Sequence, residues 1–124
     1  MHRLVVKQAE GGAALWTVEV ANSFTGRLRG LMGRPSLGDR QGLYLPGTNS
    51  IHMLFMRFAI DCVFLAAAEA DGRQRVVAVR ANVRPWTGVV WWVGGAAGAL
   101  ELAAGTAAGA RVRAGDYLRL APAA

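Results

Sequence analysis

Most of the side chains that could do chemistry in this chain are gathered in one run, Ser50–Leu65. The run reads SIHMLFMRFAIDCVFL and is the most apolar and aromatic stretch of the sequence, yet it also contains a histidine, an arginine, an aspartate and the single cysteine. Asp61 lies between Ile60 and Cys62, where the pattern predicts an interior strand. A buried carboxylate is costly unless it is paired or hydrogen-bonded. Asp61 is therefore the best candidate for a polar site.

Asp61 has a functional and a structural interpretation. It could act as a general base or anchor a ligand, or it could form a structural ion pair with an arginine. Arg57 is four residues away, about 13 Å along an extended strand, which is too far for a direct pair. We therefore expect the partner to be Arg27 or Arg34, and the sequence leaves open which of the two it is.

His52 and Cys62 together suggest a thiol nucleophile with its base. As members of one extended strand they would lie about 33 Å apart, and no residue is placed to orient the imidazole. We therefore expect Cys62 to be a small buried hydrophobic residue. With one cysteine and two histidines, the chain also lacks the four ligands of a structural zinc site. We expect no metal and no cofactor, with a weak site at His52 and Asp61 as the alternative.

Three tryptophans, Trp86, Trp91 and Trp92, are the other unusual feature. Neighbouring residues on a strand point to opposite faces, so burying both Trp91 and Trp92 would require cover on both sides. Either one ring is in the core and the other partly exposed, or the rings form a pocket wall or a protein-contact patch. The sequence does not decide between these alternatives.

The segments around these residues read as short strands joined by turns. Asp71-Gly72 predicts a hairpin, and the spacing of Phe24, Leu28 and Leu31 predicts a short helix. The expected strands are Arg3–Lys7, Leu15–Ala21, Leu43–Leu45, the run Ser50–Leu65 with a break near Arg57–Ala59, Val63–Ala68, Arg75–Val83, Thr87–Val93, Ala99–Ala103 and Tyr117–Leu120.

These elements predict an α+β fold that is predominantly β. We expect a small barrel-like sheet of about eight short strands, since closure removes exposed edges. One short N-terminal helix is expected at about 23–33 and a helical turn near 106–110. The 124 residues form a single domain, 1–124. We expect the net charge of +6 to be mostly solvated surface. With no leader and no apolar run of about 20 residues, we expect a soluble, cytoplasmic protein.

Four sequence blocks in a fixed order resemble a known family. They are FTGRLRGLMGR, SIHMLFMRFAIDCVF, LELAAG and VRAGDYL, and the chain resembles the domain of unknown function 192 family over about 18–120. The resemblance implies a small β-rich domain with a short N-terminal helix, found in bacteria and archaea, and it implies no activity. Ala59 stands where the family usually has proline. The matching family positions are Arg27, Gly30, Leu31, Met32, Arg34, His52, Met56, Asp61, Glu101, Gly105, Gly115 and Asp116.

The preferred function is a non-catalytic binding or accessory module. Its pocket would take a small anionic ligand, because the arginine fork suits a carboxylate or phosphate. The residues expected to frame it are Arg27, Arg34, His52, Met56, Asp61 and Trp86. The alternatives are a small hydrolase or lyase that uses Asp61 and His52 as an acid–base pair, and a protein-interaction domain that uses Trp91 and Trp92. A protein partner is compatible with the sequence, whereas nucleic-acid binding and membrane insertion are not expected.

Overall fold

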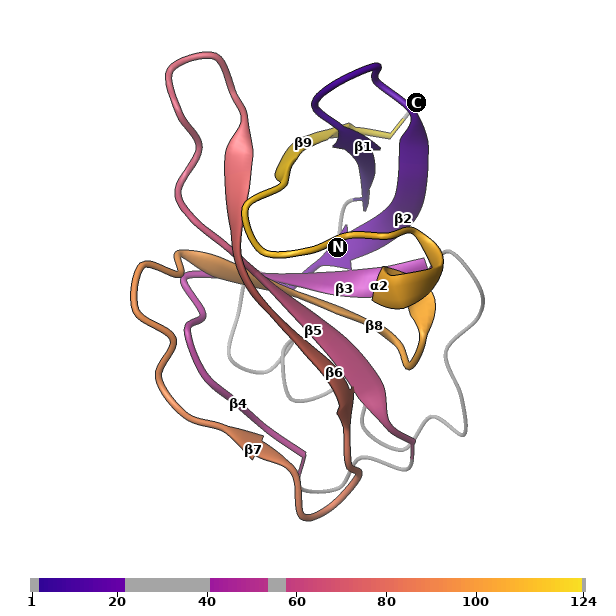
Figure 1. The fold of residues 1–124 in the computed structure, drawn as a ribbon, viewed down its shortest axis with the longest axis vertical. Helices are drawn as coiled ribbons and strands as arrows, with labels where there is room; N and C mark the ends of the chain where they lie inside the picture. The colour runs from indigo at the N-terminus through magenta and orange to yellow at the C-terminus, as the bar shows by residue number, and fades with distance from the viewer. Residues whose placement is uncertain (1–2, 22–40, 54–57, 124) are drawn as a thin grey trace.

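The structure, a computed structural model, describes residues 3–21, 41–53 and 58–123, which form nine strands and one short helix (Figure 1). The strands are β1 (Arg3–Gln8), β2 (Ala14–Val20), β3 (Gln41–Pro46), β4 (Ile51–His52), β5 (Ile60–Leu65), β6 (Gln74–Val83), β7 (Val89–Val90), β8 (Gly98–Ala103) and β9 (Tyr117–Pro122). The helix is α2 (Thr106–Gly109).

Seven of the described strands close into a barrel. Their order around the ring is β1-β2-β3-β8-β5-β6-β9, and β4 and β7 form a separate two-stranded sheet. Neighbouring strands are antiparallel except for β2 and β3, which run parallel. The seam between β6 and β9 is the shortest ladder in the ring, since only Gln74 and Arg75 are in register with β9.

The interior of the barrel is filled by apolar side chains from the strands of the ring. Every second residue of β5 points inward, as Val63 and Leu65 do, and both are fully buried. The other buried members of this interior core are Val6, Trp16, Val18, Val76, Leu100, Leu102, Ala107, Val112 and Leu118. Because residues on a strand alternate between faces, the remaining residues of β5 must be covered from outside.

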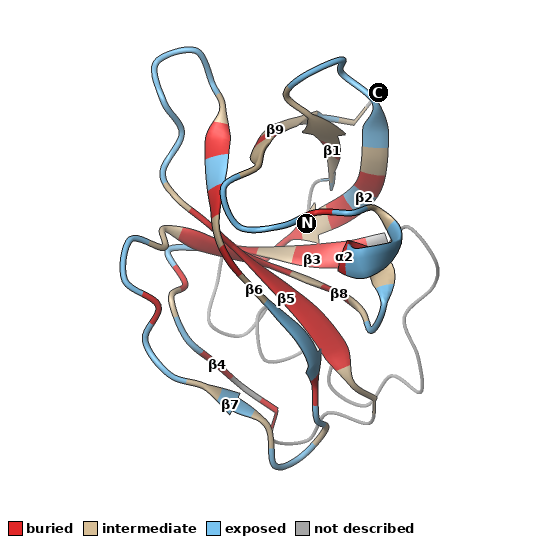
Figure 2. Cartoon of the chain, in the orientation of Figure 1, coloured by how far each residue is buried: buried red, intermediate tan, exposed pale blue. Residues whose placement is uncertain are grey.

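That outer cover comes from the β4–β7 arm, which we define as residues 51–53 and 84–93. Ile51, Met53 and Val93 are buried and belong to the same apolar cluster as Cys62 and Phe64 of β5. β5 is consequently buried on both faces and appears as a continuous buried ribbon in the middle of the molecule (Figure 2). A strand covered on both faces reads as a nearly continuous apolar run, which explains the composition of β5 apart from Asp61.

The mainly β fold class and the barrel-like closure predicted from the sequence are confirmed, and so is the helical turn near 106–110. The run Ser50–Leu65 is divided as expected, because β4 ends at His52 and β5 begins at Ile60. The predicted helix at 23–33 lies outside the described residues. The strand expected at Thr87–Val93 is much shorter, since only Val89–Val90 are in a ladder. The left-handed backbone of Trp86, at φ 65°, turns the chain immediately before that segment.

Candidate functional site

Asp61 lies on the inner face of β5, fully buried, with both carboxylate oxygens in use. Oδ1 accepts a hydrogen bond from the backbone N–H of Asn82 at 2.9 Å, and Oδ2 accepts one from the backbone N–H of Ala107 at 3.0 Å. The first donor belongs to β6 and the second to the first turn of α2. The carboxylate therefore connects three segments that are far apart in the sequence.

Neither of these two N–H groups has a hydrogen-bond partner within its own strand ladder or helix. Between Ile60 and Cys62 the register with β6 shifts, so that Val83 and Arg80 are their partners and β6 carries an extra residue. A bulge of this kind leaves a backbone group out of the ladder, and Asn82, at φ 53°, has the left-handed backbone that asparagine tolerates. Ala107 is in the first helical turn, where N–H groups have no partner within the helix. Asp61 satisfies both donors.

The ion pair predicted between Asp61 and Arg27 or Arg34 stays a prediction, because both arginines lie outside the described residues. Within the described residues the ion pairs of carboxylates are confined to the β5–β6 hairpin. The described contacts support a structural role for Asp61, because its two hydrogen bonds hold β6 and α2 against β5. Its use with His52 as an acid–base pair stays a prediction.

A second carboxylate, Glu101, lies on the outer face of the sheet. Glu101 of β8 is in register with Leu43 on one side and with Cys62 on the other. The next strand continues the row, since Cys62 is also in register with Arg80. Side chains in register across neighbouring strands share a face, so Glu101 stands in the apolar surroundings of the outer cluster.

Burial alters the acid–base behaviour of this row. Burial raises the pKa of Glu101 from its ordinary 4.5 to about 7. Burial also raises the pKa of the Cys62 thiol, with smaller contributions from the charge of Glu101, which raises it further, and of Arg80, which lowers it. Cys62 is fully buried, so the structure confirms it as a core residue. A reactive cysteine requires an exposed thiolate of low pKa, and Cys62 has neither property.

The sequence-based reasoning did not include Glu101 in the site, although it is one of the matching family positions. The alternation of residues along β8 could have indicated it, because Glu101 shares a face with Ala99 and Ala103. The 33 Å separation expected for His52 and Cys62 assumed one continuous strand. It does not apply, because His52 is in β4 and Cys62 is in β5 of a different sheet.

The tryptophans of the β4–β7 arm face solvent. Trp91 is 81% exposed, Trp92 75% and Trp86 52%, and Val89 beside them is 45% exposed. Of the two alternatives left open by the sequence, the one with a core ring and a partly exposed ring is excluded for Trp91 and Trp92. Their chain segment follows β7 along the outer edge of the arm (Figures 1 and 2).

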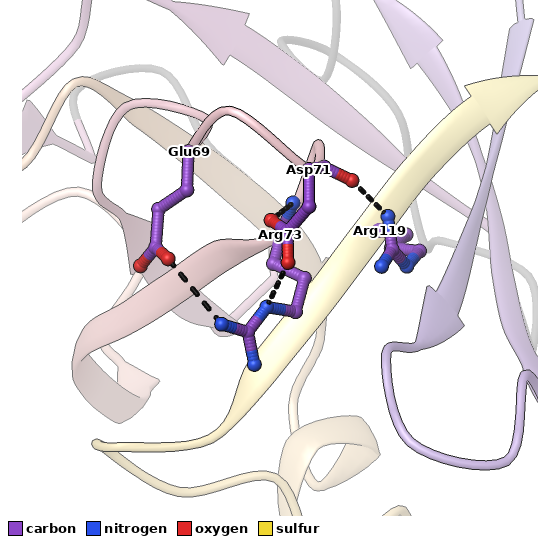
Figure 3. Close-up of polar contacts among 4 residues, drawn as sticks. All are labelled: Glu69, Asp71, Arg73 and Arg119. Carbon is purple, nitrogen blue, oxygen red and sulfur yellow. Dashed lines mark hydrogen bonds and ion pairs between the residues drawn. The ribbon is translucent and has the colours of Figure 1, made fainter.

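A third polar group lies at the β5–β6 hairpin and fastens it to β9 (Figure 3). Arg73 contacts Asp71 at 2.7 Å and Glu69 at 3.4 Å, and its guanidinium lies 4.5 Å from the centre of the Tyr117 ring. Arg119 of β9 donates a hydrogen bond to the Asp71 carbonyl. These ion pairs are largely exposed, so the hairpin clasp that they form contributes little to stability.

Of the six residues expected to frame a pocket, the structure describes three. His52 pairs with Val89 in the arm, and the Trp86 N–H donates to the carbonyl of Met53 at 2.8 Å, so Trp86 and His52 are near neighbours. Asp61 faces the barrel interior, on the other side of β5 from the arm. The remaining three, Arg27, Arg34 and Met56, lie outside the described residues, and the pocket as a whole stays a prediction.

Two features are absent from the described residues. These residues contain no group of three or more His, Cys, Asp or Glu side chains that could hold a metal ion. No helix in this part of the chain is both long enough and apolar enough to span a membrane. The cytoplasmic location stays a prediction.

Similar structures share this fold over nearly the whole chain. A candidate transcription regulator from Sinorhizobium meliloti 1021 superimposes with a TM-score of 0.77 at 26% identity, covering 96% of this chain and 92% of the other. A protein of unknown function from Novosphingobium aromaticivorans DSM 12444 superimposes with a TM-score of 0.74 at 24% identity, covering 94% and 83%.

The sequence comparisons agree with the structural ones. A UPF0127 protein from Thermococcus sibiricus is 32% identical over 87 residues, which are 67% of this chain, and the chain spans about half (53%) of that relative's length. The family model described as an uncharacterised ACR family, domain of unknown function 192, matches residues 5–120. The chain therefore belongs to the domain of unknown function 192 family.

Proposed function

We propose that this domain is a non-catalytic binding module that contacts a protein partner through the tryptophans of the β4–β7 arm. The observation that carries the proposal is the exposure of Trp91 and Trp92, at 81% and 75%. A tryptophan buries about 150–250 Å² in a contact, and tryptophan is enriched among the residues that dominate binding energy. Two exposed rings that are adjacent in sequence leave a large apolar area in water, and a bound partner would remove that area from water.

The arm is suited to present these rings in a fixed position. Its inner residues Ile51, Met53 and Val93 are buried against the barrel, and the N–H of Val93 donates to the carbonyl of Asn49 at 2.8 Å. A contact surface held by packing loses little conformational entropy on binding, which favours affinity. The described contacts fit a binding role as well, because Asp61 accepts hydrogen bonds from two backbone N–H groups and Cys62 is buried.

The test is a double substitution, Trp91→Ser with Trp92→Ser, compared with the wild-type domain. A partner isolated with the wild-type domain should bind the variant at least about 100-fold more weakly, as expected for the loss of two central aromatic contacts. The matched control is Arg3→Ser with Thr17→Ser, which changes two exposed residues on β1 and β2. Tryptophan fluorescence provides a direct readout, since binding should shift the emission of the exposed rings to shorter wavelength. A partner that binds the double variant and the control equally well would disprove the proposal.

The small-anion pocket is a second candidate, supported by the contact that brings Trp86 to Met53, next to His52. Titration with acetate and phosphate should shift the NMR signals of Arg27, Arg34 and His52 together and saturably. Shifts confined to surface arginines such as Arg73 and Arg75 would exclude this pocket.

A further inference from the structure

The seam of the barrel leaves part of β6 without a neighbour on one side. β6 is in register with β9 at Gln74 and Arg75, and the contact continues to Val76, whose N–H donates to the Asp116 carbonyl at 2.7 Å. Beyond Val76, β6 continues to Val83 with β5 on one side and no described strand on the other. The residues at 80–82 are exposed. A strand edge of this kind presents backbone N–H and C=O groups that another chain can pair with.

A groove of about 800 Å³ runs along this edge. One wall is β6 from Val77 to Ala81, and the other consists of α2 and the segment Arg111–Ala114. Its floor is made of alanine and valine side chains. The charged residues that line it are three arginines, Arg80, Arg111 and Arg113, and no acidic residue lines it.

These three arginines have no acidic partner among the described residues, where the ion pairs belong to Arg73. Arg111 also has a left-handed backbone, at φ 58°. This conformation ends α2 in a Schellman motif, since the Val112 N–H donates to the Ala107 carbonyl at 3.0 Å and the Arg111 N–H to the Ala108 carbonyl at 3.0 Å. A strand edge, an apolar floor and three available guanidinium groups therefore meet in one groove.

We propose that this groove binds an extended acidic peptide segment of another protein, which adds to β6 as a further strand. Strand addition obtains its affinity from main-chain hydrogen bonds and its specificity from alternate side chains. Glutamate or aspartate side chains would pair with the arginines through charge-assisted hydrogen bonds, and the intervening apolar side chains would lie on the alanine and valine floor. The proposal is independent of the tryptophan contact, because it uses a different element.

A second copy of this domain is a poorer occupant of the same edge. In a symmetric pair of β6 edges, the same patch would face itself. The three arginines of one copy would then meet the three of the other, and like charges on neighbouring strands destabilise the pairing. Charge complementarity thus selects an acidic partner.

The probe is a synthetic peptide of seven residues that alternates valine and glutamate, with blocked ends, titrated into the intact domain. We expect saturable binding by calorimetry, with amide NMR shifts and slowed hydrogen exchange within residues 77–81, which line the groove. A peptide with lysine in place of glutamate should bind at least about tenfold more weakly, which tests the charge. A peptide N-methylated at alternate residues on its pairing edge should lose affinity to a similar degree, which tests the strand pairing.

The variant Arg111→Gln with Arg113→Gln should weaken binding of the acidic peptide about tenfold, since two charge-assisted contacts are lost. The matched control, Arg3→Gln with Lys7→Gln, removes the same charge from β1 and should bind as the wild type does. The Trp91→Ser, Trp92→Ser variant should also retain binding, so that the two proposals can fail separately.

Four outcomes would overturn the proposal. Equal binding of the N-methylated peptide would mean that no strand is added. An equal loss in the control variant would mean that only net charge attracts the peptide. Binding of a single-stranded oligonucleotide but not of the peptide would assign the groove to nucleic acid, and dimerisation through β6 would assign it to a second copy.

Discussion

At the scale of single residues, Asp61 is a carboxylate whose partners are backbone groups. We expect Asp61→Asn to lower the free energy of unfolding by about 2–4 kcal/mol, because the amide keeps one acceptor and turns a donor towards a backbone N–H. Urea denaturation measures the change. Glu10→Gln, an exposed control, should change stability by less than about 0.5 kcal/mol. Equal stability of Asp61→Asn and wild type would show that the two hydrogen bonds are dispensable.

Glu101 should make stability depend on pH. Its pKa is raised by burial from 4.5 to about 7 in the folded state, so between these values the unfolded chain loses the proton first. The stability that the neutral form provides is complete below pH 4.5 and is lost as pH rises through about 7. The difference is on the order of 3 kcal/mol.

Urea denaturation at pH 5 and pH 8 tests this expectation. Glu101→Gln should be more stable than the wild type at pH 8 and should lack the decline between the two pH values. The exposed Asp71 has its pKa lowered, chiefly by its hydrogen bond to the Arg73 N–H, so its contribution changes only below its ordinary value of 3.8. A wild-type stability that rises from pH 5 to pH 8 would contradict the assignment to Glu101.

Cys62 should react as a core residue does. Its side chain is fully buried and its pKa is raised, so a thiol reagent at neutral pH should label it only as fast as the protein opens. Cys62→Ala should cost about 1 kcal/mol, the range for removing one buried group, and leave partner binding unchanged. Labelling of native protein at the rate of the urea-unfolded chain would show that the thiol is accessible.

At the scale of elements, the turn of the arm depends on Gly88. A Cβ at this position would lie 2.4 Å from the carbonyl oxygen of Arg84 and 2.7 Å from a side-chain carbon of Val83. The Gly88 carbonyl also accepts the Met53 N–H at 2.9 Å. We expect Gly88→Ala to displace the arm and cost about 1–3 kcal/mol, as overpacking does.

Two measurements together distinguish a displaced arm from an unfolded barrel. One is the affinity for the partner, and the other is the set of NMR signals from the barrel interior. Gly88→Ala should weaken the tryptophan-mediated contact while the NMR signals of the barrel interior stay in place. Gly94→Ala, next to the arm and with open space around it, is the matched control. Wild-type affinity in Gly88→Ala would show that the contact does not require this turn.

The sequence predicts those elements that depend on local chemistry. Alternation of apolar residues predicts the strands, Asp71-Gly72 predicts the β5–β6 hairpin, and the break in Ser50–Leu65 follows from its length. The partners of Asp61 are not predictable in this way. They are backbone N–H groups at Asn82 and Ala107, 21 and 46 residues away, and a backbone donor released by a bulge or a helix start has no residue type that identifies it.

The exposure of the arm could not be predicted for a related reason. Whether Trp91 and Trp92 are covered depends on which surface the arm packs against. The buried residues of the arm, Ile51, Met53 and Val93, pack in one cluster with residues of other strands. Glu101 could have been predicted in part, since alternation places it on one face of β8. Its raised pKa depends on burial in the folded molecule, which the sequence of β8 does not reveal.

At the scale of the whole molecule, the two proposed contact surfaces lie on different elements. The arm covers the outer face of β5, while the arginine groove follows the free edge of β6. Asp61 lies on the inner face of β5 and binds the elements that border the groove, β6 and α2. A rigid scaffold that carries its binding residues on peripheral segments is common among binding domains.

The closure of the ring also has a consequence for how the chain folds during synthesis. Leu4 of β1 pairs with Pro122 of β9, and the ladder between them extends from Leu4 to Gln8. Bringing such distant residues together is slow, because the entropy of closing a long loop is lost before the contacts form. The β1–β2 hairpin can form early on the ribosome, but its outer edge stays bare until β9 has emerged. During that interval an unpaired strand edge invites aggregation, so the nascent chain is most vulnerable at β1.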